Sequence, residues 1–321
     1  MNLVRHIFSG GSPVRALPIS EPPLPLNYVL SAFRWHLDSR PSSKAILVHD
    51  LFGSAVSWQQ LLNENLSRLP MSQLSPTTPL ELYAVELRGH NHSVALPCPT
   101  EGDNYTLASA ADVVLHQKQI LRTDAKLVGL GFGALVACQA ALHSPLLSFD
   151  SLTLFVNGPS QLLSCDPSHY QLPSILQGVP RGARSLEELE QYLRKKVPNA
   201  VERALIFAAA ERHDGGLRFR FSEELLKLHG PCTGATDIAE GIAFEKRVTV
   251  IHCGNEAFPQ EAKDRFLKRF PRAMFLQFKG DRSAGIAGLY AQGSTFVCTF
   301  LEALEMLGSV EGEEKEGVQG E

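Results

Sequence analysis

Short, continuous apolar runs recur through the middle of the chain and alternate with longer amphipathic stretches. Apolar runs bounded by polar residues or glycine are typical of strands buried on both faces of a parallel sheet. The predicted strands are 45–48, 82–85, 125–128, 152–156, 248–251 and 274–278. The predicted helices are 57–66, 107–121, 132–141, 261–270 and 295–307. This alternation predicts an α/β fold with a mostly parallel, twisted sheet and helices on both of its faces.

Two insertions interrupt the alternation of strands and helices. Residues 70–79 are rich in proline, serine and threonine and are predicted to form a surface loop. A second insertion is predicted to form a helical cap, with helices over 185–197 and 200–212. The expected organisation is an N-terminal segment over residues 1–22, a core formed by residues 23–160 and 241–307, the cap over residues 161–240, and an acidic tail over residues 308–321.

The two ends of the chain differ from its middle in charge. No acidic residue precedes Glu21, whereas Arg5, Arg15 and three serines occur in the first twenty residues. Such a composition is typical of a mitochondrial presequence, so a matrix location is expected; the alternative is a disordered terminus on a cytoplasmic protein. Residues 309–321 contain five glutamates and few apolar residues, which predicts a solvated tail.

Composition narrows the classes of function. The 321 residues are 44% hydrophobic and carry a formal net charge of -4, without a basic stripe that would suit a nucleic-acid backbone. No run approaches the length of about 20 apolar residues that a membrane helix needs. The six cysteines are scattered, which favours reduced thiols over disulfides or a metal site. Neither a cofactor nor a metal is therefore expected.

The most informative motif lies between the strand 125–128 and the helix 132–141. Residues 129–133 read Gly-Leu-Gly-Phe-Gly, which is the nucleophile elbow G-x-S-x-G of a hydrolase with glycine in place of serine. The outer glycines, Gly129 and Gly133, suit a tight turn from strand to helix. Gly131, at the nucleophile position, carries no reactive group.

Several motifs in order resemble the α/β-hydrolase superfamily, and within it the small bacterial and mitochondrial esterases and thioesterases. The matching segments are 25–28, His-Asp-Leu-Phe-Gly-Ser at 49–54, Arg-Gly-His-Asn-His-Ser at 88–93, Asn104-Tyr105 leading to Asp112, 214–220, and Phe-Pro-Arg-Ala at 270–273. Each motif alone is weak, but their shared order over roughly residues 25–305 implies the α/β-hydrolase fold.

The resemblance also implies a catalytic triad, and all three of its positions are altered. The nucleophile position holds Gly131, the acid position after strand 152–156 holds Asn157, and the histidine position falls on Ser283. The last histidine of the chain is His252, which precedes the final predicted strand. Asp50 stands where the family has glycine, which would put a negative charge near the place where an oxyanion forms.

These substitutions favour a catalytically inactive hydrolase-like protein that acts as a structural or protein-interaction subunit, with protein partners in a larger mitochondrial complex. A second hypothesis is a binder of an acyl or other apolar small molecule, in a vestigial pocket lined by His49, Asp50, Leu51, Phe52 and Phe132. A third is an esterase or thioesterase that uses Cys138 or Asp50 as nucleophile. Cys138 is otherwise expected to be a buried hydrophobic residue, and His49 and His90 to hold loops through hydrogen bonds.

Overall fold

A seven-stranded sheet forms the centre of the computed structural model. The structure describes residues 26, 28–33, 42–66, 80–93, 104–144, 149–163, 175–176, 178–179, 185–198, 200–213, 216–222, 225, 242–283 and 285–305. Its strand order is β1-β3-β2-β4-β5-β8-β9. The strands are β1 (Tyr28–Phe33), β2 (Ser43–Val48), β3 (Leu80–Val85), β4 (Ala125–Leu130), β5 (Phe149–Val156), β8 (Arg247–His252) and β9 (Ala273–Gln277). All pairings are parallel except that of the edge strand β1 with β3.

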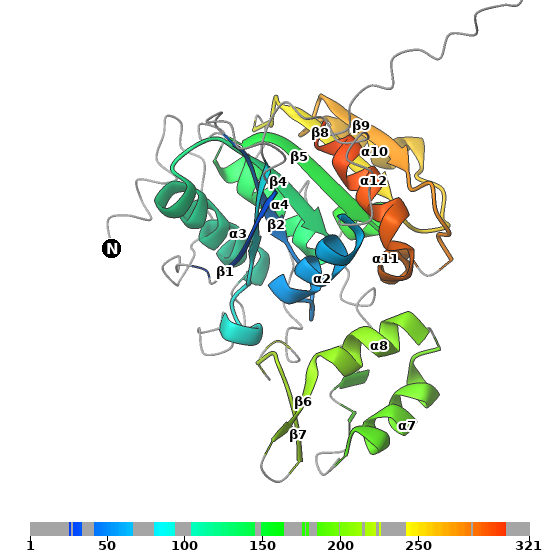
Figure 1. Ribbon diagram of the computed structural model, residues 1–321. Coiled ribbons are helices and arrows are strands. Elements are labelled where there is room, and N and C mark those ends of the chain that lie inside the picture. The colour runs from blue at the N-terminus through cyan, green and yellow to red at the C-terminus, as the bar shows by residue number, and fades with distance from the viewer. Residues whose placement is uncertain are drawn as a thin grey trace, which may run out of the picture.

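Helices cover both faces of this sheet, as the sequence predicts (Figure 1). One face carries α2 (Ala55–Leu66), α11 (Gly285–Leu289) and α12 (Gly293–Ala303). The other carries α3 (Tyr105–His116), α4 (Phe132–His143), α5 (Pro159–Leu163) and α10 (Gln260–Leu267). Because the strands are buried on both faces, Ile46 and Val48 of β2 join one apolar cluster while Ala45 and Leu47 join the other.

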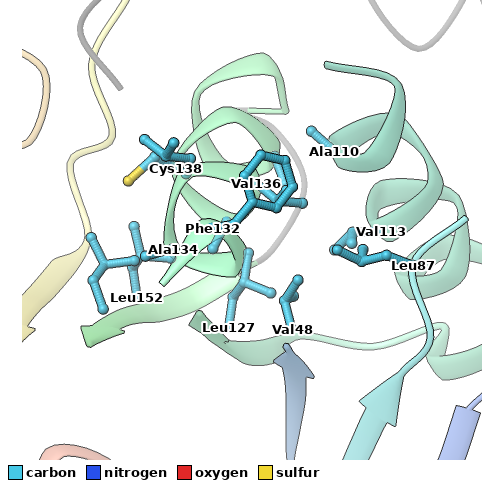
Figure 2. Packing of buried hydrophobic residues seen from close by; sticks show 14 of the residues in the cluster. Val48, Leu87, Ala110, Val113, Leu127, Phe132, Ala134, Val136, Cys138 and Leu152 are labelled. Carbon is cyan, nitrogen blue, oxygen red and sulfur yellow. The ribbon is translucent and has the colours of Figure 1, made fainter. Parts of the chain in front are cut away.

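Helix α4, which follows the glycine-rich turn, lies at the centre of one layer. Every residue from Phe132 to Leu142 is buried, as expected of a helix that is apolar on all sides. Figure 2 shows Phe132 and Val136 near Val48 of β2 and Leu127 of β4. This packing fixes the start of α4, and therefore the turn before it, against the carboxyl ends of the strands.

The cap combines helices with a β-hairpin. Helices α7 (Leu186–Lys196) and α8 (Ala200–Ala208) match the two predicted helices in position. The prediction of a helix through residue 212 is wrong, because the chain leaves α8 and forms β6 (Ala210–His213), which pairs with β7 (Gly216–Phe219). Cross-strand ion pairs hold this hairpin: Glu211 contacts both Arg218 and Arg220.

Helix α3 ends earlier than the sequence predicts. Its α-helical part stops at His116 and continues as a π-helical turn over Gln117–Leu121. Arg122 then adopts a left-handed conformation (φ 54°), and the Gln117 side-chain amide donates to the Thr123 carbonyl at 2.8 Å. Short 3-10 turns cover Asn91–Ser93 and Tyr290–Gln292.

Three predicted features lie outside the described residues: the segment 1–22, the loop 70–79 and the tail 308–321. Among the helices that the structure describes, none has both the length and the apolar character needed to cross a bilayer.

Candidate functional site

The glycine-rich turn between β4 and α4 has the geometry of a nucleophile elbow. Gly131 lies at φ 59° and ψ −117°, a backbone conformation that residues with a side chain rarely adopt. A Cβ on Gly129 would come within 2.6 Å of backbone atoms of Gly133 and Ala134, and one on Gly133 within 2.8 Å of the backbone of β2 and its following residue. The outer glycines are therefore required by close backbone packing, as the sequence predicts.

The carboxylate of Asp50 occupies the space in front of Gly131. A Cβ built on Gly131 would lie within 2.5 Å of all three carboxyl atoms of Asp50. Asp50 Oδ1 accepts hydrogen bonds from the backbone N–H of Leu51 at 2.8 Å and of Phe132 at 2.6 Å. The residue after the nucleophile position and the loop after β2 supply the two N–H groups of an oxyanion hole in this fold. The Asp50 carboxylate is therefore hydrogen-bonded to both N–H groups at the position of the oxyanion hole.

Two buried histidines anchor the loop that carries Asp50. The Nδ1–H of His49 donates to the Asp50 carbonyl at 2.8 Å, and its Nε2 accepts from the Leu87 N–H at 3.1 Å. His90 Nε2 accepts from the Phe52 N–H at 3.2 Å, and its Nδ1–H donates to the Arg88 carbonyl at 3.1 Å. These bonds hold the loops after β2 and β3 together, as expected from the sequence.

Each imidazole is held in the neutral form. Burial lowers the pKa of His49, although the nearby Glu86 carboxylate opposes part of that shift. Burial lowers the pKa of His90 well below its ordinary value, and the neighbouring His49 lowers it further. Neutral rings suit a site in which one nitrogen of each ring must accept a backbone N–H.

A buried carboxylate that the sequence analysis missed belongs to Glu86, directly after β3. Its Oε1 accepts from the Ala55 N–H at the start of α2 at 2.9 Å, and its Oε2 accepts from the Asn91 side chain at 3.0 Å. The signal that could have identified it is its position directly after a buried strand, where polar residues of a parallel sheet gather. Glu86 and Asp50 thus place one carboxylate at the start of α2 and one at the start of α4.

Tyr290 is the other residue near the site that sequence reasoning did not identify. It belongs to the segment between β9 and α12, the region from which the family supplies its histidine. Its hydroxyl interacts with the Ser57 side chain, and burial together with the negative charge of Asp50 raises its pKa. No motif marks this tyrosine, because its proximity to Asp50 depends on how the segment 285–292 packs.

The loop after β3 is held by a buried ion pair. Arg88 Nε and Nη2 donate to the two carboxylate oxygens of Asp112 at 2.8 and 2.7 Å, and both side chains are fully buried. The Tyr105 hydroxyl donates to the Arg88 carbonyl at 2.7 Å. These residues belong to two of the motifs that carry the family resemblance, and the structure brings them into one network.

Asn157, at the predicted acid position, has a structural partner. Its Oδ1 accepts from the Ile286 N–H near the start of α11 at 2.6 Å. Its carbonyl accepts from Nε2 of His252 at 2.9 Å, and burial lowers the pKa of that histidine. Ser283, at the predicted histidine position, is exposed and donates its N–H and its hydroxyl to the Asp281 carboxylate, each at 2.9 Å. The two positions therefore take part in separate local networks.

The five residues of the predicted vestigial pocket have different environments. The side chains of Leu51 and Phe52 are partly buried, and the Phe52 ring lies 4.7 Å from the ring of Phe221 in the cap. The Phe132 ring is only 1% exposed and stacks on Tyr105, so Phe132 reaches the site through its N–H alone. His49 is equally buried and holds loops, and Asp50 fills the space at Gly131.

Cys138 packs as a buried apolar residue. It is fully buried on α4, among the apolar side chains in Figure 2, and burial raises its thiol pKa well above the ordinary value. A thiol held protonated in this way is a poor nucleophile. Cys138, Cys253 and Cys298 are all free thiols in the part of the chain that the structure describes.

The sheet order, the elbow turn and the N–H donors of Leu51 after β2 and Phe132 at the start of α4 define an α/β-hydrolase fold. The model of the alpha/beta hydrolase family matches residues 45–282, which is more than half of the chain. The chain belongs to the alpha/beta hydrolase family.

Solved structures with the same fold include several hydrolases. A marine microorganism esterase aligns over 86% of this chain and 99% of its own with a TM-score of 0.64 and 18% identity. The enol-lactonase from Burkholderia xenovorans LB400 aligns over 87% and 96%, with a TM-score of 0.54 and 16% identity. The thioesterase domain from the curacin biosynthetic pathway aligns over 84% and 98%, with a TM-score of 0.53 and 16% identity. At these identities the likeness concerns the fold alone. No curated protein sequence matches the chain.

Proposed function

We propose that this chain is a non-hydrolytic member of the alpha/beta hydrolase family that serves as a structural or protein-interaction subunit of a mitochondrial assembly. The observation that carries the proposal is the position of the Asp50 carboxylate, which accepts from the Leu51 and Phe132 N–H groups in front of Gly131. A nucleophile and the oxygen of a tetrahedral intermediate would both need that space.

The negative charge of Asp50 opposes hydrolysis in front of Gly131 as much as the lack of space there does. An oxyanion hole accelerates acyl transfer because its donors stabilise charge that develops in the transition state, and loss of one donor costs roughly 10²–10³ in turnover. Here both donors are bonded to an oxygen that is already anionic. A second negative charge at the same place would be repelled by Asp50 rather than stabilised.

The groups that would move a proton are also replaced. Gly131 has no side chain, and the Asn157 amide is engaged with the N–H of Ile286. Ser283 bonds to Asp281. Since loss of a complete triad costs on the order of 10⁶ in turnover, residual acceleration would depend on the oxyanion donors, and Asp50 occupies those.

A role in binding other proteins is supported by the retention of the fold without this machinery, since a binding platform needs the scaffold and not the triad. The mitochondrial location rests on the presequence-like composition of the first twenty residues. Binding of an apolar ligand above Gly131 is less favoured than protein binding, because Asp50 fills the space at Gly131 and the Phe132 ring is packed in the core.

The proposal is tested with purified protein and with mitochondria. Activated esters and thioesters should be hydrolysed no faster than in buffer, and acyl ligands should not raise the melting temperature. The native chain extracted from mitochondria should migrate in a complex larger than the monomer. Turnover that disappears in an Asp50→Ala variant would contradict the non-hydrolytic assignment. Migration of all the chain as free monomer would contradict the role as a subunit.

A further inference from the structure

His49 and His90 form a pair of imidazoles at the base of the loop that carries Asp50. Their ring centroids lie 4.7 Å apart in an edge-on arrangement, and their side chains are 1% and 0% exposed. Each ring uses Nε2 as the acceptor for a backbone N–H: that of Leu87 for His49 and that of Phe52 for His90. The pair therefore connects the loop after β2 to the loop after β3 only while both Nε2 atoms lack a proton.

We propose that His49 and His90 form a proton-sensitive latch, whose protonation releases the loop 50–52 and frees the Asp50 carboxylate from the N–H groups of Leu51 and Phe132. The inference concerns the movement of this loop and does not depend on whether the chain hydrolyses esters.

The direction of the effect follows from the hydrogen bonds. A doubly protonated imidazole has donors at both nitrogens and accepts at neither. Protonated His49 would point an N–H at the Leu87 N–H, and protonated His90 would point one at the Phe52 N–H. Each contact would change from a hydrogen bond to a repulsion inside a buried site, where an unpaired donor costs about 1–3 kcal/mol. Because Phe52 lies two residues after Asp50, loss of its anchor acts directly on the loop.

The charged and titratable groups around the pair decide which ring takes the first proton. Glu86 Oε1 lies 3.7 Å from His49 Nε2, so a negative charge faces that ring. On His90 the neighbours are the Tyr105 hydroxyl, 3.4 Å from Nδ1, and His49 itself. The Arg88 guanidinium is paired with Asp112, and Asp50 directs its carboxylate away, to the N–H groups of Leu51 and Phe132. His49 is therefore the ring that protonates first.

Acid should favour the open loop. Burial lowers the pKa of both rings in the closed loop, whereas exposed rings in an open loop would titrate near the ordinary value of about 6.5. Between these values the open loop binds more protons than the closed loop, so acidification favours opening. The latch is thus closed above about pH 6.5. Below that pH the equilibrium constant for opening the loop rises, by up to about tenfold per pH unit for each ring that takes up a proton.

Amide hydrogen exchange between pH 7.5 and 5, corrected for intrinsic rates, tests the latch. Protection of the Leu51 and Phe132 amides should fall at least tenfold across this range, while amides of β4 and β5 keep their protection. The variant His49→Gln keeps an acceptor and a donor but does not titrate, so it should reduce this pH dependence. His143→Gln serves as the matched control, because His143 bonds to Gln139 on α4 and its pKa is also lowered by burial.

Two results would overturn the latch. One is protection of Leu51 and Phe132 that does not change with pH in the native protein, or that changes equally in His49→Gln. The other comes from the native protein alone, in case the variant fails to fold. Imidazole ¹⁵N spectra at pH 7.5 should show the proton on Nδ1 of both rings, and a proton on Nε2 of either ring would contradict the arrangement.

Discussion

Replacing Gly131 by serine is expected to destabilise the protein by about 3 kcal/mol and to create no hydrolase. The new Cβ would lie within 2.5 Å of the Asp50 carboxyl atoms, so Asp50 must leave the N–H groups of Leu51 and Phe132. Overpacking of this kind costs about 1–3 kcal/mol, and the left-handed backbone of a residue with a side chain adds about 1–2 kcal/mol. Urea unfolding of the variant and the native chain measures the loss.

A double-mutant cycle assigns that loss to Asp50. Asp50→Gly opens the space, so the pair Asp50→Gly with Gly131→Ser should be more stable than the sum of the single losses predicts, by about 2 kcal/mol. Gly158→Ala is the matched control, because a Cβ there meets Glu256 Oε2 at an ordinary 3.5 Å. Additive losses in the cycle would show that the Asp50 carboxylate is not what excludes a side chain at position 131.

Disruption of the Arg88–Asp112 pair is expected to cost about 3–5 kcal/mol. Asp112→Asn removes the charge that compensates a fully buried guanidinium, and an uncompensated buried charge is among the most destabilising changes known in proteins. The loss should appear as a lower free energy of unfolding in urea. It should also loosen the loop 88–93, because the Arg88 carbonyl accepts from Tyr105 and His90.

An exposed ion pair supplies the control for the buried one. Glu190 and Arg194 lie one turn apart on α7, with side chains 49% and 67% exposed, and Glu190→Gln should cost no more than about 0.5 kcal/mol. The double variant Arg88→Met with Asp112→Leu should be more stable than Asp112→Asn, because it leaves no buried charge. An Asp112→Asn protein as stable as Glu190→Gln would contradict the structural role given to the buried pair.

Most of the core could be predicted from the sequence. The buried strands 45–48 and 82–85 are continuous apolar runs, and 248–251 is apolar except for Thr249, a pattern typical of a strand covered on both faces. Each lies inside an observed strand. The elbow could be predicted because backbone contacts at Gly129 and Gly133 leave no room for a Cβ. The turn therefore requires glycine at both positions, and the sequence shows it. These constraints are local, which is why one sequence is enough to reveal them.

The arrangement of the site could be predicted only in part. The sequence places a charge at Asp50 near the oxyanion donors, but the direction of its carboxylate depends on the turn from Asp50 to Gly53, in which Phe52 has φ 64°. Tyr290 comes near Asp50 through the packing of a segment far away in sequence. The β6–β7 hairpin was missed because residues 209–212, which read Ala-Ala-Glu-Arg, favour a helix that continues α8. The ion pairs of Glu211 with Arg218 and Arg220 form only once the chain has folded back.

Under the proposed function, the absence of a nucleophile and the stability of the turn have the same cause. In a hydrolase the N–H groups of the loop after β2 and of the start of α4 must stay available for a reaction intermediate, whereas here the Asp50 carboxylate accepts from both. Glycine at position 131 also avoids the backbone strain that a serine would have there. Under the proposed function, Asp50 and Gly131 would therefore exclude catalysis and stabilise the turn at the same time.

The proposed function depends on the Asp50 carboxylate filling the space that a nucleophile and its oxyanion would need. A crystal structure of the native protein at pH 7.5 would show where this carboxylate lies. The carboxylate should lie within hydrogen-bond distance of the Leu51 and Phe132 N–H groups, with no room for a further molecule at Gly131. A carboxylate turned away from both N–H groups, with a ligand or a histidine in its place, would contradict it.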